Sequence, residues 1–298
     1  MRSSSAEAWG RFFMRYDRLH FYTVDPGAHA MACELVPLAI DMGRLGDWFG
    51  EGWAAANESR CKPVSALPRS LTPKEAVLIG TQTNVARTQI MLRELAKVGA
   101  ATIFLFDHWK NYAENFGDGP LSDVIVVPDE VGRRLLTSAL GPHAEVRAVV
   151  LPHVAIEAVA DRILASKVST QPGSVTLLLD PTEAEDGLGY DWRTTIAALA
   201  GYPAARGWAR IAVRPHPRQD AAVIAGEVAT LRRCGIPADI CVDPIEQLIA
   251  QAQEVWGMTT VGLNVALAVG KPIRSFQIGR NGKGARMSNP HIEPFVIS

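Results

Sequence analysis

The sequence lacks the signatures of several protein classes. It contains only four cysteines, Cys33, Cys61, Cys234 and Cys241, and no two of them form a Cys-x-x-Cys pair. This spacing argues against both a disulfide framework and a zinc site. Lysine and arginine together number 30 against 31 acidic residues, so no excess of positive charge indicates a nucleic-acid partner.

Long apolar runs are missing as well. No stretch reaches the roughly 20 apolar residues that a membrane-spanning helix needs. The first five residues are not followed by the apolar core of a signal peptide. Because 48% of the residues are hydrophobic, the composition is that of an ordinary globular protein. We therefore expect a cytoplasmic protein in a reducing compartment.

Aromatic residues gather near the N-terminus. Trp9, Phe12, Phe13 and Tyr16 have the spacing of one helical face, and arginines lie between them. A basic amphipathic helix of this kind can lie on an anionic membrane surface, which would place residues 1–18 at the inner face of the membrane. Alternatively, the aromatic face packs against the rest of the domain and the arginines face water.

Short apolar stretches alternate with helical patterns along the whole chain. The apolar residues 76–80 and 175–179, for example, are followed by helical patterns at 85–97 and 192–199. This alternation is typical of parallel sheets covered by helices on both faces. A polar segment that ends in Pro-Gly, residues 166–173, separates two such runs and is typical of a linker. The sequence therefore predicts an α/β protein with two Rossmann-like, doubly wound domains, residues 1–165 and 174–298, facing across a cleft.

One candidate site lies at the end of a predicted strand, where Arg214 is followed by Pro215, His216 and Pro217. The two prolines restrict the backbone around the histidine. Open α/β sheets bind their ligands at the carboxyl ends of the strands. An arginine and a histidine at such a place suit an anionic group such as a phosphate, or proton transfer to a leaving oxygen.

A second candidate site comprises Gly257, Thr259 and Thr260, which follow another predicted strand and precede a helix. Backbone N–H groups, threonine hydroxyls and the helix dipole together can bind a phosphate. Alternatively, one of the threonines only caps the helix. A basic segment at residues 280–286 would either add phosphate contacts or form an ordinary surface loop.

An acidic pair, Glu185 and Asp186, precedes Gly187 in the loop after the predicted strand at residues 175–179. The two carboxylates have no basic neighbour in the sequence. Taken alone, the pair is typical of a solvated acidic turn. Only its place upstream of His216 makes it a candidate for chemistry.

The first predicted domain offers further candidates for the cleft. Asp25, Gly27 and His29 follow the first predicted strand, although the Pro-Gly pair there is also typical of a tight turn. Asp107 and His108 open a polar, aromatic loop after another strand. That loop has too many hydrogen-bonding side chains for a pure core role. The alternative is that Asp107 caps a helix at a wet surface.

Three segments of the chain resemble GT-B glycosyltransferases, in which two Rossmann-like domains hold a nucleotide sugar. The segments are PLSDVIVVPDEVGRRLL, VRPHP and DPIEQLIAQAQEVWGMTTVGLNVALAVGKPIRSF. More narrowly, Glu185-Asp186-Gly187, His216-Pro217 and Thr259-Thr260 match, in order, three motifs of bacterial sialyltransferases and polysialyltransferases. The last two motifs are also similar to those of the CDP-glycerol polyol-phosphate transferases of teichoic-acid synthesis.

The resemblance implies metal-independent transfer of a sugar, with a sialic-acid-like sugar on a CMP donor favoured, to a surface-glycan or lipid-linked acceptor, with no cofactor. Asp186 would be the general base on the acceptor hydroxyl. His216 would aid departure of the nucleotide phosphate, which Thr259 and Thr260 would hold. Residues 1–165 would bind the acceptor and residues 174–298 the nucleotide. Where related sequences carry a glutamate that binds the nucleotide ribose, this chain has Asn264.

Two other functions stay open at this stage. The protein could be an epimerase or hydrolase of the nucleotide sugar itself, with Asp25, Asp107 and His108 as acids and bases. It could also be a non-catalytic member that binds a nucleotide or a partner. Release of nucleotide that depends on an acceptor indicates a transferase, whereas binding without turnover indicates the non-catalytic alternative.

Overall fold

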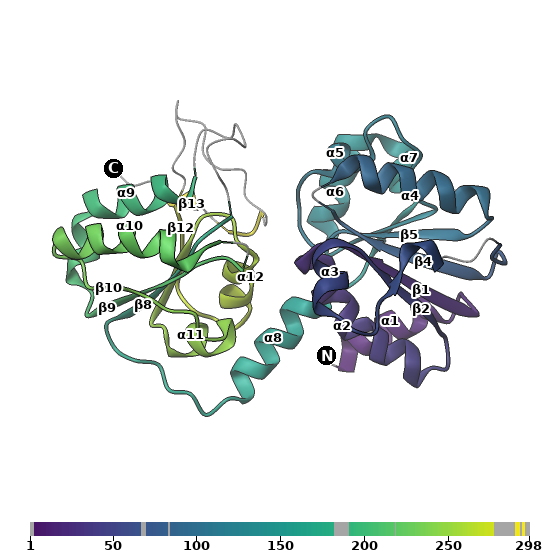
Figure 1. The fold of residues 1–298 in the computed structure, drawn as a ribbon. Helices are drawn as coiled ribbons and strands as arrows, with labels where there is room; N and C mark the ends of the chain where they lie inside the picture. The colour runs from purple at the N-terminus through teal and green to yellow at the C-terminus, as the bar shows by residue number, and fades with distance from the viewer. Residues whose placement is uncertain are drawn as a thin grey trace. The chain divides into compact units, whose positions relative to one another are not determined.

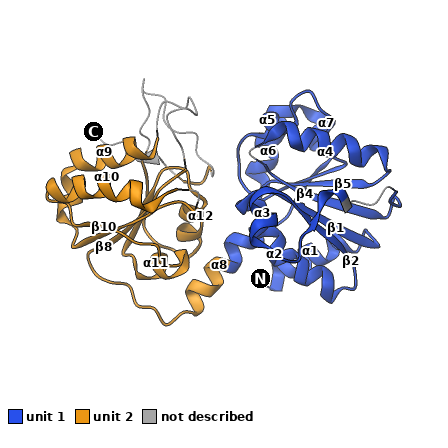
Figure 2. Ribbon diagram, viewed as in Figure 1, with its two compact units in different colours: residues 1–158 blue, residues 159–298 orange. Residues whose placement is uncertain are grey.

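The protein folds into two compact units, each built on a parallel sheet with helices packed on it (Figures 1 and 2). The structure, a computed structural model, describes residues 3–66, 70–82, 84–181, 191–217, 219–276, 290–292, 294 and 295. Unit 1 is Met1–Ala158 and unit 2 is Val159–Ser298. The boundary falls inside helix α8 (Val154–Ala165). The prediction of two α/β units with parallel sheets is confirmed.

Unit 1 has seven strands in the order β3-β2-β1-β4-β5-β6-β7. The strands are β1 (Arg18–Thr23), β2 (Leu45–Gly50), β3 (Lys62–Pro63), β4 (Glu75–Gly80), β5 (Ala101–Leu105), β6 (Val124–Val127) and β7 (Ala148–Val150). The helices are α1 (Ser3–Phe13), α2 (Pro26–Asp41), α3 (Gly52–Asn57), η1 (Val64–Ala66), α4 (Val85–Lys97), α5 (Tyr112–Phe116), α6 (Glu130–Leu140) and α7 (Pro142–Glu145), followed by α8.

The sheet of unit 1 has a separate hydrophobic core on each face. Successive side chains of a strand point to opposite faces. Accordingly, Leu19 and Phe21 of β1 belong to the core that α1, α2 and α8 cover, whereas Tyr22 belongs to the core that α4, α5 and α6 cover. This double burial explains why the strands have nearly continuous apolar sequences.

The N-terminal aromatic residues are part of the first core. Trp9, Phe12, Phe13 and Tyr16 are each at most 9% exposed, and the Trp9 indole N–H donates a hydrogen bond to the Pro152 carbonyl at 3.0 Å. The aromatic face of α1 therefore packs against the rest of unit 1, as the second interpretation of this segment expects. Contact of residues 1–18 with a membrane stays a prediction. Among the described helices, none is both long and apolar enough to cross a bilayer.

The described residues of unit 2 form six strands in the order β10-β9-β8-β11-β12-β13. The strands are β8 (Ser174–Leu178), β9 (Arg210–Arg214), β10 (Ala238–Ile240), β11 (Glu254–Gly257), β12 (Ile273–Phe276) and β13 (Pro294–Phe295). The helices are α9 (Trp192–Gly201), η3 (Pro203–Gly207), α10 (Ala221–Arg233), α11 (Ile245–Gln251) and α12 (Val261–Ala268). Side chains of α9 and α10 share the main core with β8 and β9, and α11 contributes Leu248 to a smaller core on Ala212.

Both sheets have a point at which the strand order reverses. In unit 2 the chain runs outward from β8 to β9 and β10 and then returns to β11 on the other side of β8. This is the strand order of Rossmann domains, which bind ligands at the carboxyl ends of the strands beside the reversal. Leu178 of β8 is in register with Arg214 of β9 and Gly257 of β11, so the three strands end together. In unit 1 the corresponding strands are β1 and β4.

Candidate functional site

Three loops of unit 2 are joined by hydrogen bonds at the reversal point of its sheet. Asp180 follows β8, and its carboxylate accepts a hydrogen bond from the Thr259 backbone N–H at 2.8 Å. The Asp180 carbonyl accepts another from the Gln219 side chain at 2.9 Å. The same Gln219 amide accepts from the His216 backbone N–H at 2.7 Å. The structure therefore brings the His216 loop and the Thr259 loop together, with Asp180 between them.

The Thr259 loop does not offer all of its donors to a ligand, because Asp180 already takes the Thr259 N–H. Thr260 caps α12, and its hydroxyl oxygen accepts from the Gly262 N–H at 3.3 Å. Thr260 therefore caps the helix, as the second interpretation of the two threonines expects for one of them. A capping hydroxyl still has its own hydrogen to donate, so this role is compatible with phosphate binding.

Two glycines allow the close packing of this loop. A Cβ on Gly257 would lie 3.2 Å from the Leu178 carbonyl oxygen, and one on Gly262 would lie 2.3 Å from a Leu178 methyl group. The contact at Gly257 is tighter than most real Cβ contacts, and the one at Gly262 is shorter than real Cβ atoms show. The start of α12 thus rests directly on the end of β8, as in nucleotide-binding sheets where glycine permits close helix–strand packing.

Asn264 is buried in α12, with 3% of its surface exposed. Neither its side-chain oxygen nor its side-chain nitrogen has a hydrogen-bond partner. A buried polar group without a partner costs about 1–3 kcal/mol. The Asn264 amide, which is predicted to bind the ribose, therefore has no hydrogen-bond partner among the described residues.

Arg214 lies at the end of β9, but its guanidinium bonds to the loop after β10, not to the Thr259 loop. The guanidinium Nε–H donates to the Asp243 carbonyl in the loop after β10, at 3.3 Å. Burial lowers the pKa of Arg214 from its usual value, and the Glu246 carboxylate partly opposes that shift. The strand order places β10 and β8 on opposite sides of β9, so this contact joins Arg214 to the strand farther from Thr259. Pro217, next to His216, is exposed.

Several predicted residues lie outside the described part of the chain. They include the acidic pair Glu185 and Asp186, and the basic segment at residues 280–286. Their proposed roles therefore stay predictions.

In unit 1 the candidate residues Gly27 and Asp107 are in direct contact. A Cβ on Gly27 would lie 1.8 Å from the Asp107 carboxylate oxygen Oδ2, so only glycine fits beside this carboxylate. The other carboxylate oxygen accepts a hydrogen bond from the Thr81 hydroxyl, which follows β4. Asp25 precedes α2, and its carbonyl accepts from the His29 N–H at 3.0 Å. The structure thus places Gly27, Asp107 and Thr81 at the reversal point of unit 1.

Two histidines flank Asp107. The His153 Nδ1 accepts from the Ile156 N–H at 3.3 Å, so its Nε2 carries the hydrogen that it donates to the Asp107 carbonyl at 2.9 Å. Burial lowers the pKa of both His153 and His108, and both are therefore neutral at pH 7. The His108 Nε2 lies 3.8 Å from the Asp107 carboxylate, and its Nδ1 is buried without a hydrogen-bond partner.

His29 does not join this group. Residues two apart on a helix point in nearly opposite directions. Gly27 faces Asp107, whereas the His29 ring stacks on Trp48 at a centroid distance of 5.1 Å and meets the edge of Trp53 at 5.2 Å. At 8% exposure, His29 lies within unit 1 rather than on an open surface.

The segment after β5 is not the uniform polar loop that the sequence predicted. Its second half is helix α5, and Tyr112 and Phe116 are buried against Phe106 in the second core of unit 1. Trp109 is also buried and donates a hydrogen bond to Asp129 at 2.8 Å. The sequence argued against a pure core role for this loop. Its aromatic residues are nevertheless buried, and the Trp109 indole N–H has a hydrogen-bond partner inside the fold.

Sequence reasoning missed several residues at the two reversal points. Asp180 could have been found, because it is an acidic residue directly after a buried strand. Gln219 lies on a loop and gave no local signal. In unit 1, Gln82 follows β4, is 5% exposed, and has neither amide atom hydrogen-bonded. Glu51 follows β2 and is held by the Arg87 guanidinium at 2.5 and 2.9 Å.

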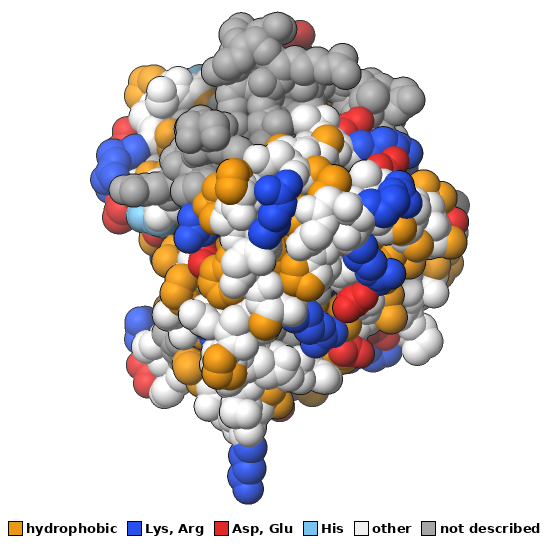
Figure 3. Space-filling view, turned by 90° about the vertical axis from the view of Figure 1, so that its left-hand side faces the viewer, with side chains coloured by type: hydrophobic (Ala, Val, Ile, Leu, Met, Phe, Trp, Pro, Cys, Tyr) orange, Lys and Arg blue, Asp and Glu red, His pale blue; other side chains and the backbone are white. Residues whose placement is uncertain are grey.

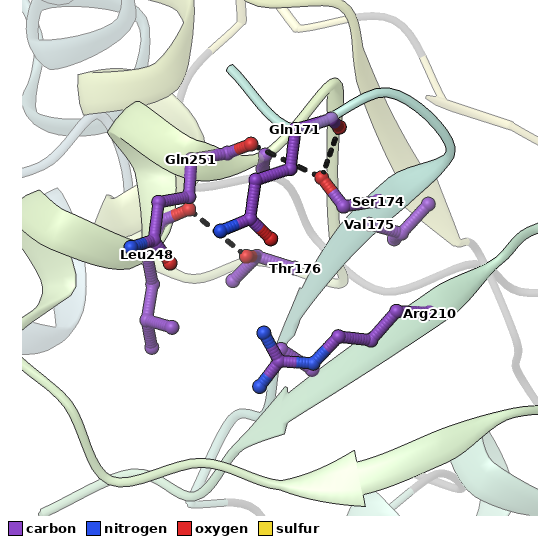
Figure 4. Close-up of a pocket in the computed structure, with 9 residues that line it drawn as sticks. Gln171, Ser174, Val175, Thr176, Arg210, Leu248 and Gln251 are labelled. Carbon is purple, nitrogen blue, oxygen red and sulfur yellow. Dashed lines mark hydrogen bonds between the residues drawn. The ribbon is translucent and has the colours of Figure 1, made fainter. Parts of the chain in front are cut away.

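Two cavities among the described residues lie away from these loops. Figure 4 shows one at the beginning of β8 and β9, where Ser174 and Thr176 donate hydrogen bonds to carbonyls near the end of α11. Its volume of about 10 Å³ has room for a single water molecule. Another, of about 150 Å³, lies on α6 and α7 between Arg133, Arg134, Thr137 and Glu145. On the face that Figure 3 shows, acidic and basic side chains are interspersed among apolar and uncharged ones.

Two solved structures share this fold. A glycosyltransferase from Rickettsia africae ESF-5 aligns with 91% of this chain and 80% of its own, with a TM-score of 0.54 and 8% sequence identity. The trehalose-6-phosphate structure from E. coli bound with UDP-2-fluoro glucose aligns with 88% of this chain and 85% of its own, with a TM-score of 0.51 and 11% identity. No protein-family model and no curated protein matches the sequence.

At these identities the likeness concerns the fold. The predicted fold class of two Rossmann-like α/β domains with parallel sheets is confirmed, and the two solved glycosyltransferase-type structures share it. The narrower resemblance to sialyltransferases and polysialyltransferases stays a prediction.

Proposed function

We propose that the protein is a nucleotide-sugar-dependent glycosyltransferase whose unit 2 binds the nucleotide. The observation that carries this proposal is the meeting of the His216 and Thr259 loops at the reversal point of the unit 2 sheet, held together through Asp180. Rossmann-like sheets bind nucleotides at this place. The GT-B fold of the chain is compatible with such chemistry, although fold alone does not fix function.

The nucleotide phosphate would lie at the start of α12. There the Thr260 hydroxyl can donate to it, and the helix dipole favours its negative charge. Because Asp180 takes the Thr259 N–H, the contribution of Thr259 would come from its hydroxyl. The Asn264 amide, which has no protein partner, would bind a ribose hydroxyl.

The proposed reaction combines the positions of His216, Thr259 and Thr260 with the role that the motif resemblance implies for Asp186. The acceptor oxygen forms a bond to the sugar carbon while the bond from that carbon to the phosphate oxygen breaks. Asp186 takes the acceptor proton, and the nucleotide leaves with the electron pair, helped by a hydrogen bond or proton from His216. We favour a CMP donor with a sialic-acid-like sugar and a glycan or lipid-linked acceptor, from the motif resemblance. The reaction would need no divalent metal, so magnesium and a chelator should give the same nucleotide affinity.

The first test is a thermal-shift panel with CMP, CDP, UDP, GDP and TDP on the wild-type chain. A nucleotide at 100 times its dissociation constant should stabilise the protein by about 2.7 kcal/mol. The same nucleotide should fail to stabilise the His216→Ala and Thr260→Ala variants. If both variants bind like the wild type, the nucleotide site lies elsewhere.

The second test concerns the chemistry. Asp186→Asn keeps the shape of the side chain but cannot take a proton, so turnover should fall by about 10²–10⁴-fold while nucleotide affinity stays unchanged. A rate within a few-fold of wild type would show that Asp186 is only a turn residue. Equal losses of affinity and rate would make it a structural support.

A nucleotide-sugar epimerase or hydrolase is the second candidate, and the grouping around Asp107 favours it. That grouping puts a buried carboxylate beside the neutral His108 in unit 1. Acceptor dependence separates the two functions. A transferase releases nucleotide faster when an acceptor is present, whereas a hydrolase releases it at the same rate.

A further inference from the structure

A histidine, a cysteine and a glutamate meet on the α2 side of unit 1. His29 and Cys33 lie one turn apart on α2, and Glu58 follows the last residue of α3. One ligand atom from each lies within 4.8 Å of the other two. The distance from His29 Nε2 to Cys33 Sγ is 3.3 Å.

We propose that His29, Cys33 and Glu58 form a binding site for a divalent transition-metal ion such as zinc. An imidazole, a thiolate and a carboxylate are the ligand types that zinc takes. Ideal tetrahedral geometry with the usual zinc–nitrogen and zinc–sulfur bond lengths separates those two atoms by about 3.6 Å. The observed pair is close to that separation, so the two helical ligands need little movement. A fourth position would be open to water.

His29 is prepared for such a role. Burial lowers the pKa of His29, so the ring is neutral at pH 7, which is the form that binds metals. Trp48 on one side and Trp53 on another fix the orientation of the ring. The second ring nitrogen, Nδ1, is buried without a hydrogen-bond partner. Neither ring nitrogen is therefore committed to a strong acceptor within the protein.

The other two ligands differ in their ionisation. Hydrogen bonds from Arg60 lower the pKa of Glu58 to about 2, so its carboxylate is charged. Burial raises the pKa of the Cys33 thiol, so this group is protonated until a metal displaces the proton. Metal binding would therefore release one proton from Cys33, and the affinity would rise with pH.

Arg60 orients the carboxylate. Its guanidinium donates to both oxygens of Glu58, at 2.6 and 2.9 Å, and lies 5.0 Å from the centre of the Trp48 ring. Metal-binding carboxylates are commonly held by such outer hydrogen bonds. Without a metal, Cys33 and His29 would share a hydrogen bond and Glu58 would stay paired with Arg60.

The cysteine spacing could not reveal this site, because only one of its ligands is a cysteine. The expectation of no zinc site rested on the lack of a Cys-x-x-Cys pair. Here the fold supplies an i, i+4 pair from one helix and a carboxylate from the end of another. The site lies within unit 1, and it does not depend on the glycosyltransferase proposal.

The test uses the full chain, stripped with a chelator and titrated with Zn²⁺ against a chromophoric competitor. The wild type should bind one zinc per chain and gain thermal stability. Cys33→Ser and His29→Gln should each lower the affinity by at least about 100-fold, the upper end of what changes around a metal site cause. Cys234→Ser, which removes a thiol from unit 2, is the matched control and should bind like the wild type.

A cobalt titration gives a second measurement that does not depend on the stability of the variants. Wild-type protein loaded with Co²⁺ should show a thiolate-to-metal charge-transfer band, and Cys33→Ser should lack it while keeping the wild-type circular dichroism spectrum. Failure of the wild type to bind Zn²⁺ above the level of a surface site would overturn the proposal. Equal binding by wild type and Cys33→Ser would overturn it as well.

Discussion

The Asp180 carboxylate accepts a hydrogen bond from the Thr259 backbone N–H at 2.8 Å, across the reversal point of the unit 2 sheet. Both residues are buried, at 7% exposure each. The bond joins the loop after β8 to the loop that starts α12, although the two lie far apart in the sequence. The carboxylate therefore helps to hold the start of α12 in place beside the strand ends. The proposed phosphate would bind there.

The first prediction concerns this bond. Asp180→Ala leaves the buried Thr259 N–H without its charged acceptor, so the free energy of unfolding should fall by about 1.5–3 kcal/mol. Nucleotide affinity should fall with it, because the start of α12 loses its support. Urea denaturation and thermal shift measure the two effects.

The control for this experiment is Asp239→Ala in the same sheet. Asp239 forms an exposed ion pair with Arg232, and exposed pairs contribute about 0–1 kcal/mol. Equal losses of stability in the two variants would show that the Asp180 bond contributes no more to the free energy of unfolding than an exposed ion pair.

The second prediction uses two glycines with opposite surroundings. Gly27→Ala places a methyl group on the Asp107 carboxylate, which must then leave the Thr81 hydroxyl. Overpacking of this kind costs about 1–3 kcal/mol. Gly226→Ala, inside α10, places its methyl group in open space and should stabilise the protein by about 0.5–1 kcal/mol. Chemical denaturation of both variants gives the sign of the change in the free energy of unfolding. A loss of stability in Gly226→Ala, or a gain in Gly27→Ala, would contradict the surroundings described for these two glycines.

Elements with a strong, regular pattern were predictable from the sequence. The helix at 85–97 has the predicted bounds, because it combines an amphipathic repeat with an Asn84 cap. The apolar strands were also predictable, since burial on both faces leaves few polar positions. Strand β2 was not, because it contains two glycines and an aspartate, which are depleted in strands. Tertiary packing makes this segment a strand, because Trp48 packs into one core of unit 1 and Phe49 into the other.

The candidate site was predictable only where it follows strand ends. His216 and Thr259 were found in this way, since parallel strands end at one edge of the sheet. Gln219 was missed because its importance comes from bonds to two other segments, which no local pattern records. His29 was grouped with Gly27 because they are close in sequence. The helix turns them to opposite sides, so closeness in sequence gave the wrong neighbour.

The third prediction is a loss of stability of unit 1 below pH 6.5. Burial holds the folded-state pKa of His153 below its usual value of 6.5, so the unfolded chain takes up a proton first as the pH falls. The stabilisation from the neutral ring is present above pH 6.5 and is lost as the pH falls toward the folded-state pKa. Protonation would also end the acceptor role of Nδ1 toward Ile156.

The variant His153→Gln removes this titration while keeping a side chain that can donate to the Asp107 carbonyl. As the pH falls below 6.5, the slope of unfolding free energy against pH should be smaller than in wild type, by at most about 1.4 kcal/mol per pH unit for one proton. Urea denaturation across this range measures it. Parallel curves for the two proteins would mean that His153 takes up its proton equally in the folded and unfolded states.

The last prediction separates stability from binding at Asn264. The Asn264→Leu substitution replaces a buried amide that has no hydrogen-bond partner with an apolar side chain of similar size. The ligand-free protein should therefore become more stable, by about 1–3 kcal/mol, because an unsatisfied polar group is removed from the interior. If the amide grips a ribose hydroxyl, nucleotide affinity should fall in the same variant, by about 10-fold for each hydrogen bond lost. Thermal denaturation without ligand and titration with the nucleotide found in the panel give both values. Higher stability with unchanged affinity would show that Asn264 has no part in binding, and lower stability would show that its amide has a partner inside the folded protein.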